Sequence, residues 1–194
     1  MKHLVIGLGE VGSAIRNILD CDGYDPYKEG GTLNGPYDMV HICFPWQAEF
    51  VKEVRRYTGS GKAKHVVIHS SVPIGTCDAE GWTHSPVRGV HPNLEEGIRT
   101  FVKYFGGQGA ELAAHVFDDL GIKTKTFETA RTTEAAKLLD TTQYGLMIMI
   151  EKRIHEWCER NNVRFDLVYN EFNRTYNTGY IQLGMPHVVR STRS

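Results

Sequence analysis

A glycine-rich loop close to the first residue constrains the fold of this chain most strongly. Residues 7–12 read GLGEVG, a G-x-G-x-x-G pattern that follows a short apolar run and opens a stretch with helical spacing. In such a loop the first glycine permits a tight turn, the second lets the backbone approach a pyrophosphate, and the third lets helix and strand pack closely. The helix N-terminus adds amide donors and the positive end of its dipole. We therefore predict a dinucleotide site on Gly7, Leu8, Gly9, Glu10, Val11 and Gly12, with a ligand-free glycine turn as the weaker alternative.

Strand-like and helix-like patterns alternate over the first 127 residues. We expect strands at residues 3–7, 23–26, 38–44, 64–69, 103–105 and 123–127, and helices at 11–19, 47–57 and 109–120. Residues 77–100 show no regular pattern, and 88–91 is the one candidate strand there. The alternation predicts an α/β fold of the Rossmann type, with a doubly wound, mostly parallel sheet.

The C-terminal third is predicted to be helical. Residues 133–161 contain no proline and only Gly145, with apolar residues at helical spacing, and a second helix is expected at 165–182. We therefore divide the chain into a Rossmann domain (1–130) that binds NAD(P) and a small all-helical segment (131–194). One long helix cannot bury all its apolar side chains against so small a domain. A homodimer through intertwined helices, with each partner completing the other's site, is the expected solution.

Polar and aromatic residues follow the predicted strands at the edge where α/β proteins bind ligands. Asp25 lies where an acidic residue would bond the ribose hydroxyls, which favours NAD without excluding NADP. Its spacing from Gly7 is slightly short of the usual ~20 residues, Asp22 competes for the role, and an Asp before a proline also forms turns. Further cofactor contacts are expected, from their place at this edge, at Phe44, Pro45 and Ser70.

A lysine near the start of the long helix is the main catalytic candidate. Lys137 and Thr141 lie one helical turn apart, on the same face. A lysine that faces a cleft beside a nicotinamide ring can shuttle a proton, whereas a surface lysine is the plain alternative. Ser71 follows a strand end and is expected to position the substrate or a water. His69, two residues earlier, is more simply a hydrogen-bonded histidine at the strand end.

Several short motifs occur in one order along the chain. They are DMVHICFP (38–45), SSVPIGT (70–76), SPVR (85–88), a glycine pair (106–107) and EAAKLL (134–139). Together they resemble the UDP-glucose/GDP-mannose dehydrogenase family, over roughly residues 1–180 and thus only its N-terminal and central domains. The resemblance implies an NAD-dependent dehydrogenase in which Lys137 is the catalytic lysine.

The chain departs from that family at positions that carry its chemistry. Thr141 stands where the family has an asparagine, Val87 stands in place of a glutamate, and no cysteine follows Cys158. We also expect the third domain of the family to be missing. Oxidation of an alcohol to an acid through a thiohemiacetal needs a thiol nucleophile. We therefore expect the thiol-dependent second step to be missing.

The segment SPVRGV (85–90) with the glycine pair is also similar to the β-hydroxyacid dehydrogenases, which include relatives of 6-phosphogluconate dehydrogenase. That likeness implies a two-electron oxidation with a lysine and no thiol. Arg88 is expected to clamp a carboxylate or phosphate of the substrate, with His91 near the same anion; a solvated loop arginine is the alternative. The expected function is an NAD(P)-dependent oxidoreductase for a small anionic hydroxy acid or sugar derivative. A non-catalytic dinucleotide-binding module, or a truncated part of a larger enzyme, remains open.

Composition narrows the classes of partner, location and cofactor that the chain can have. The chain has 22 basic and 23 acidic residues and no basic stripe, so no nucleic-acid partner is expected. The N-terminal apolar run is too short for a signal peptide or a membrane span. The four cysteines form no CxxC pair, which favours reduced thiols in the cytoplasm. The histidines lack a recognisable set of partner ligands, so no metal is expected.

Overall fold

The computed structural model describes residues 1–28, 31, 33–89 and 91–185. It divides into two compact units, Met1–Leu138 and Leu139–Ser194. The division falls within one long helix, α6 (Ala130–Arg160), so each unit is described by itself.

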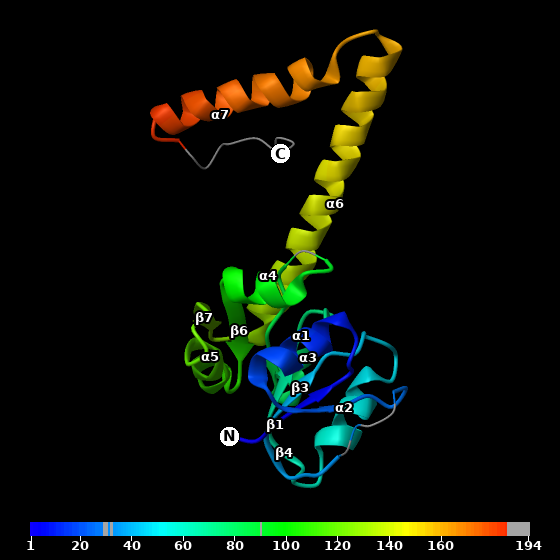
Figure 1. The fold of residues 1–194 in the computed structure, drawn as a ribbon, viewed down its shortest axis with the longest axis vertical. Coiled ribbons are helices and arrows are strands. Elements are labelled where there is room, and N and C mark those ends of the chain that lie inside the picture. The colour runs from blue at the N-terminus through cyan, green and yellow to red at the C-terminus, as the bar shows by residue number, and fades with distance from the viewer. Residues whose placement is uncertain (29–30, 32, 90, 186–194) are drawn as a thin grey trace. The chain divides into compact units, whose positions relative to one another are not determined.

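A seven-stranded sheet forms the centre of the first unit (Figure 1). Its order is β2-β1-β3-β4-β5-β6-β7, and every neighbouring pair is parallel except β5 with β6. The predicted doubly wound, mostly parallel fold is therefore confirmed. The strands are β1 (His3–Ile6), β2 (Asp22–Tyr24), β3 (Tyr37–Ile42), β4 (Ala63–Ile68), β5 (Thr83–His84), β6 (Lys103–Gly107) and β7 (Thr124–Phe127).

Helices cover both faces of this sheet, because successive side chains of a strand point to opposite faces. On β1, Val5 packs in one apolar cluster, whereas Leu4 and Ile6 pack in the other. The first cluster includes residues of α1 (Glu10–Leu19), α4 (Leu94–Thr100) and α5 (Ala110–Asp118). The second includes residues of α2 (Phe50–Thr58) and α3 (Thr76–Glu80). The strands are thus buried on both sides, as parallel strands require.

The segment 77–100 differs from its prediction as an irregular stretch, since it contains most of α3, all of β5 and all of α4. The candidate strand at 88–91 is wrong for the residues described there, because Arg88, Gly89 and His91 belong to no strand. β5 has only two residues, and its pairing with Ile68 and Gly106 defines it. Elements this short carry no periodic signal in the sequence, so only tertiary pairing reveals them.

Two acidic side chains cap each other's helices where α6 begins. The Asp78 carboxylate on α3 accepts hydrogen bonds from the backbone N–H groups of Ala130 (2.8 Å) and Arg131 (3.1 Å). In return, Glu134 on α6 accepts from the N–H groups of Gly75 (2.5 Å) and Cys77 (2.8 Å) at the start of α3. Carboxylates satisfy the orphan N–H groups of a helix N-terminus. The cap on Ala130 explains why α6 starts three residues before its predicted start.

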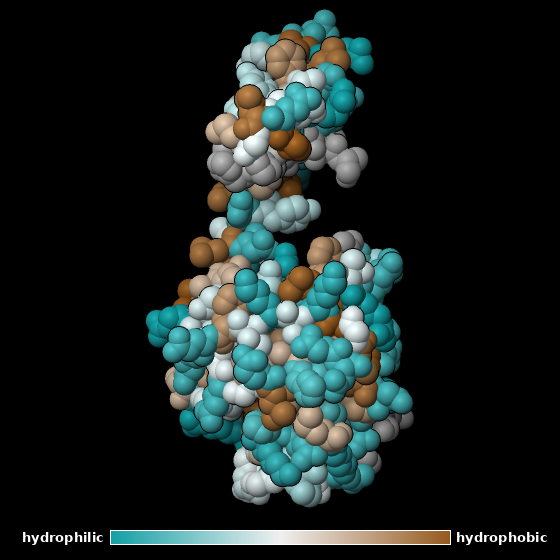
Figure 2. Space-filling view, turned by 90° about the vertical axis from the view of Figure 1, so that its left-hand side faces the viewer, coloured by the Kyte–Doolittle hydropathy of each residue, from teal (hydrophilic) through white to brown (hydrophobic). Residues whose placement is uncertain are grey.

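The second unit contains the rest of α6, a π-helical segment η1 (Asp166–Glu171) and α7 (Phe172–Gln182) (Figure 1). Its core is small and consists of Cys158, Phe165 and Tyr169, with Ile154 packed against them. Figure 2 shows apolar side chains exposed on this part of the chain. The large exposed ones include Leu139, Leu146, Met149, Ile150, Trp157, Leu167, Phe172, Ile181 and Leu183. None of the described helices has the length and apolarity that a bilayer span requires.

Candidate functional site

Two glycines of the loop are demanded by the fold itself. Gly7 has a φ of +89°, a conformation that L side chains rarely adopt. A Cβ atom on Gly12 would lie 1.7 Å from the carbonyl oxygen of Gly7, so only glycine lets α1 pack this closely against the end of β1. The first and third glycines therefore carry the structural roles that the motif predicts.

Gly9 differs, because a Cβ atom there would meet no atom of the described part of the chain within 4 Å. Gly9 is the N-cap of α1, and no side chain among the described residues caps this helix. The first N–H groups of a helix have no partner within the helix. The space beside Gly9 thus adjoins a helix N-terminus that is ready to receive an anion.

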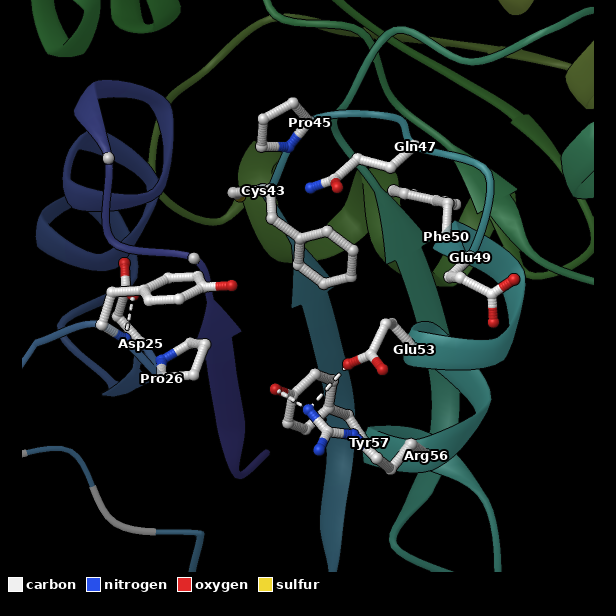
Figure 3. Close-up of a pocket in the computed structure, with 14 residues that line it drawn as sticks. Asp25, Pro26, Cys43, Pro45, Gln47, Glu49, Phe50, Glu53, Arg56 and Tyr57 are labelled. Atoms are coloured by element: carbon white, nitrogen blue, oxygen red, sulfur yellow. Dashed lines mark hydrogen bonds and ion pairs between the residues drawn. The ribbon is translucent and has the colours of Figure 1, made fainter.

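A cavity of about 690 Å³ opens at this point (Figure 3). Its wall combines the glycine loop, the residues after β2, the residues after β3, and α2. The lining residues are Gly7, Gly9, Asp25, Pro26, Tyr27, Cys43, Phe44, Pro45, Gln47, Glu49, Phe50, Glu53, Arg56 and Tyr57. Five of the predicted cofactor residues (Gly7, Gly9, Asp25, Phe44 and Pro45) therefore share one cavity.

Asp25 is held against the glycine loop. Its Oδ2 accepts a hydrogen bond of 2.8 Å from the backbone N–H of Leu8, and its Oδ1 accepts one of 3.0 Å from Tyr27. Lys28 reaches back and donates to the Leu8 carbonyl. Its competitor, Asp22, accepts instead from the Tyr37 hydroxyl at 3.3 Å and does not line the cavity.

The opposite wall comes from α2 and was missed in the sequence. Arg56 pairs with Glu53 at 2.7 Å, and its guanidinium lies over the Tyr57 ring at 4.6 Å (Figure 3). Tyr57 is buried, and this burial raises the pKa of its hydroxyl. These residues carry no motif of their own. The alternation of strand and helix and the amphipathic pattern of residues 47–57 were the only available signals.

Ser70 supports the cavity wall indirectly. Its hydroxyl donates to the carbonyl of Phe44 at 2.6 Å and joins the ends of β4 and β3. Ser71, the next residue, is exposed. Buried His84 contacts the Ser70 carbonyl through Nε2 (3.3 Å) and the Thr133 hydroxyl through Nδ1 (2.8 Å). Burial lowers the pKa of His84 to about 4, so the ring is neutral at physiological pH. The strand ends and the first turns of α6 are therefore tied together.

Lys137 lies within the same unit. Its Nζ donates to the carbonyl of Val87 at 3.2 Å, and its side chain is half-buried. This contact brings the predicted lysine to the SPVR segment, which was expected to hold the substrate. Thr141 lies one turn further along α6, in the second unit, and is exposed.

Arg88 and His91 occupy different surroundings. The Arg88 guanidinium lies 5.3 Å from the Tyr104 ring centroid and 5.7 Å from that of Phe101. Among the described residues, no carboxylate forms an ion pair with Arg88. His91 contacts the Glu10 carboxylate at 2.6 Å, at the start of α1, and both side chains are well exposed. Their roles toward a substrate stay predictions.

No protein-family model matches this chain, and no curated protein matches its sequence. Solved structures do match its fold. UDP-D-ManNAc dehydrogenase from Pyrococcus horikoshii is similar with a TM-score of 0.75 and 17% identity, over 90% of this chain and 58% of that one. UDP-N-acetyl-mannosamine dehydrogenase from Staphylococcus aureus gives 0.66 and 18%, over 87% and 57%. An imine reductase from Aspergillus terreus, in complex with NADPH4 and dibenz[c,e]azepine, gives 0.69 and 14%, over 94% and 75%.

These likenesses confirm, at the level of the fold, the resemblance to nucleotide-sugar dehydrogenases that the motifs predicted. The chain spans less than three-fifths of the length of the two UDP-sugar dehydrogenases.

Proposed function

We propose that this chain binds a nicotinamide dinucleotide, NAD in preference to NADP, and oxidises or reduces a hydroxyl or carbonyl group on a small anionic substrate. One observation carries the proposal: the uncapped N-terminus of α1 and the open space at Gly9 face the same cavity as the Asp25 carboxylate. Such an arrangement suits a ligand with a pyrophosphate and a ribose.

The residues present fit such a cofactor. The N–H groups at the start of α1 would receive the pyrophosphate, because no atom of the described residues fills the space beside Gly9. Asp25 would accept hydrogen bonds from the ribose hydroxyls, and its negative charge would repel the 2′-phosphate of NADP. The hydrogen bond from Leu8 orients this carboxylate in advance. The imine reductase that shares the fold was solved with a reduced NADP, which supports a nicotinamide cofactor of either kind.

The reaction would use residues at the carboxyl ends of the strands and on α6. A nicotinamide cofactor bound here would supply the chemistry of hydride transfer to or from the substrate carbon. Lys137 would take up or return the hydroxyl proton at Nζ, and the Val87 carbonyl holds that amine in place. The exposed hydroxyl of Ser71 would orient the substrate oxygen, and Arg88 would attract the anionic group. Thr141 stays a candidate on the next turn of α6.

We further propose that the reaction stops after one two-electron step. The nucleophilic form of a cysteine is the thiolate. Burial raises the pKa of Cys21 and of Cys43 to about 12, and it raises that of Cys77 further. Cys158 is buried in the small core of the second unit. None of the four thiols is thus placed to form the thiohemiacetal that a second oxidation requires.

A sugar derivative is a fitting substrate class, because two neighbours in fold are named for UDP-N-acetylmannosamine and its oxidation. Activity as part of a longer nucleotide-sugar dehydrogenase remains an alternative, since the chain spans only 58% of one such enzyme. We also propose a homodimer formed through the apolar surface of the second unit. All four cysteines are free thiols, which suits the reducing cytoplasm.

Calorimetric titration of the purified chain with NAD, NADH, NADP and NADPH tests the proposal. We expect saturable binding of the NAD pair and weaker binding of the NADP pair. Absence of binding for all four would overturn it. A turnover screen over hydroxy acids and sugar phosphates then separates an enzyme from a non-catalytic dinucleotide-binding module, which would bind the cofactor without consuming any substrate.

A further inference from the structure

Three histidines form a continuous ladder across the sheet, and a buried lysine ends it. His3 lies at the start of β1, His41 lies on β3, and His69 follows β4 directly. The contacts are His3 Nδ1 to His41 Nε2 at 3.2 Å, His41 Nδ1 to His69 Nε2 at 3.0 Å, and His69 Nδ1 to the Lys103 Nζ at 3.3 Å. The same Nδ1 of His69 lies 2.9 Å from the carbonyl oxygen of Ser85.

The register of the strands explains the ladder. His3 pairs with Met39, two residues before His41, and His41 pairs with Val67, two residues before His69. Since side chains alternate between faces, a shift of two residues at each strand keeps all three rings on one face of the sheet. The ladder therefore climbs diagonally from the start of β1 to the end of β4.

The ladder has one half-buried end and one buried end. His3 is half-buried, whereas His41 is 0% exposed and His69 and Lys103 are each 4% exposed. The Lys103 amine packs against the rings of Phe105 (5.4 Å) and Phe117 (5.2 Å). No carboxylate among the described residues pairs with it. A buried charge without a counter-charge is costly. Burial therefore disfavours the ammonium form of Lys103 relative to the neutral amine.

The other titratable groups near the ladder are few. Cys43 interacts with Lys103 from the end of β3, and His84 on β5 interacts with both His69 and Lys103. At the outer end, the N-terminal amine and Asp38 act on His3. α5 contributes the ring of Phe117 to both buried histidines and no charge. Desolvation lowers the pKa of Lys103 to about 7 and holds those of His41 and His69 well below the ordinary value.

Hydrogen positions in the ladder are coupled, because each contact needs one donor and one acceptor. With a neutral Lys103, the Nδ1–H of His69 donates to the Ser85 carbonyl. His69 Nε2 then accepts from His41 Nδ1–H, and His41 Nε2 accepts from His3 Nδ1–H. With a charged Lys103, the ammonium group donates to His69 Nδ1, so every ring must carry its proton on Nε2 instead.

We propose that His3, His41, His69 and Lys103 form a proton relay that carries one proton between solvent at His3 and the buried amine. On protonation, His69 passes its Nδ1 proton to Lys103 Nζ and receives the Nδ1 proton of His41 at Nε2. His41 receives the Nδ1 proton of His3 at Nε2, and His3 takes one proton from solvent at its own Nε2. One proton enters, Lys103 gains one charge, and three tautomers change together.

The relay ends behind the wall of the dinucleotide cavity. Cys43, one of the titratable groups that interact with Lys103, lines that cavity. In the charged state the Ser85 carbonyl loses its donor from His69, at the start of the segment whose Val87 carbonyl accepts from Lys137. A change of pH thereby alters the hydrogen bonding of the segment that contacts Lys137. The relay itself does not depend on the proposed cofactor.

Long-range ¹H–¹⁵N correlation spectra of the uniformly labelled chain test the relay, because they distinguish protons on Nδ1 from protons on Nε2. Between about pH 5.5 and pH 9 we expect His3, His41 and His69 to change from the Nδ1–H to the Nε2–H form together as the pH falls. Their common midpoint should coincide with that of the Lys103 Nζ signal, near pH 7. Fixed tautomers across a range in which Lys103 titrates would overturn the proposal.

Two variants extend the test beyond the wild-type chain. In Lys103→Met the three rings should stay in the Nδ1–H form, whereas in Lys125→Met, on the exposed side of β7, the switch should persist. His3→Phe removes the ring that takes up the proton from solvent at the half-buried end, so Lys103 should exchange its proton at least tenfold more slowly. A switch unaltered by Lys103→Met would contradict the relay.

Discussion

The carboxylate of Asp25 accepts a 2.8 Å hydrogen bond from the backbone N–H of Leu8. Asp25 follows β2, whereas Leu8 lies inside the glycine loop after β1, so this bond joins two parts of the cavity wall that are 17 residues apart. The carboxylate is therefore oriented before any ligand arrives, with its other oxygen bound by the N–H of Tyr27. Preorganised acceptors of this kind lower the entropic cost of binding.

Removal of the Asp25 charge should change cofactor choice. Asp25→Asn keeps one oxygen that accepts from Leu8, but its NH₂ group cannot accept from Tyr27, and it loses the charge that attracts ribose hydroxyls and repels a 2′-phosphate. We expect the ratio of NAD to NADP affinity to fall about tenfold or more, a difference of roughly 1.4 kcal/mol, in calorimetric titrations. Asp22→Asn, which lies outside the cavity, is the control and should leave the ratio unchanged. An unchanged ratio in Asp25→Asn would remove this residue from the cofactor site.

The second and third glycines of the loop should respond differently to alanine. Gly9→Ala adds a Cβ atom to open space, so the free energy of unfolding should change by less than ~0.5 kcal/mol, whereas dinucleotide affinity should fall at least tenfold. Gly12→Ala places its Cβ against a backbone oxygen and should destabilise the fold by about 2 kcal/mol or more. Urea unfolding and calorimetry measure both effects. Wild-type affinity in a folded Gly9→Ala chain would contradict the assignment.

Lys137 should affect turnover rather than cofactor binding. In Lys137→Met the proton-carrying amine is lost, so kcat for the substrate found by screening should fall by about 10²- to 10⁴-fold. The Kd for the dinucleotide should stay within about twofold, because Lys137 contacts the Val87 carbonyl and does not line the cavity. Lys152→Met, an exposed position on the same helix, is the matched control. A loss of only cofactor affinity would argue against catalysis by this lysine.

The buried amine of Lys103 should make stability depend on pH. Its pKa is about 7 in the folded chain against 10.5 for the ordinary side chain, so the unfolded state binds more protons between those values. The free energy of unfolding therefore rises with pH in this window, and Lys103 destabilises the folded chain most at the low-pH end of the window. The free energy of unfolding of Lys103→Met should exceed that of the wild type by a few kcal/mol near pH 7. This advantage should shrink by about 1.4 kcal/mol per pH unit as pH rises toward 10.

Urea unfolding at several pH values, with Lys125→Met as a surface control, measures this difference. If the difference in free energy of unfolding between Lys103→Met and the wild type stayed constant with pH, the amine would have the same protonation in the folded and unfolded states.

The exposed apolar groove on α6 should hold a second copy of the chain. Leu146, Met149, Ile150 and Trp157 line it, and the core of their own unit is too small to account for them. We expect the wild type to sediment as a dimer at micromolar concentration. Ile150→Asp should give a monomer, whereas Leu120→Asp, an exposed leucine of the first unit, should not. A monomeric wild type would refute the dimer.

Local pattern was sufficient for most of the fold. The glycine loop, the alternation of apolar runs with amphipathic stretches, and the long proline-free segment predicted the sheet and α6. The physical reason is that these features repeat over many residues, so each element can be recognised from a short stretch of sequence. The positions of Gly7, Gly9, Asp25, Phe44 and Pro45 around one cavity followed from the same logic, since parallel strands end at one edge of a sheet.

Tertiary structure alone decided what depends on residues far apart in the chain. The short elements α3, β5 and α4 exist because neighbouring strands and caps define them, and the reciprocal bonds of Asp78 and Glu134 join positions more than fifty residues apart. His3, His41, His69 and Lys103 are scattered over a hundred residues, and each looks ordinary in its own segment. Only strand order and a register shift of two residues bring them into contact, because sheet pairing is non-local and no local pattern encodes it.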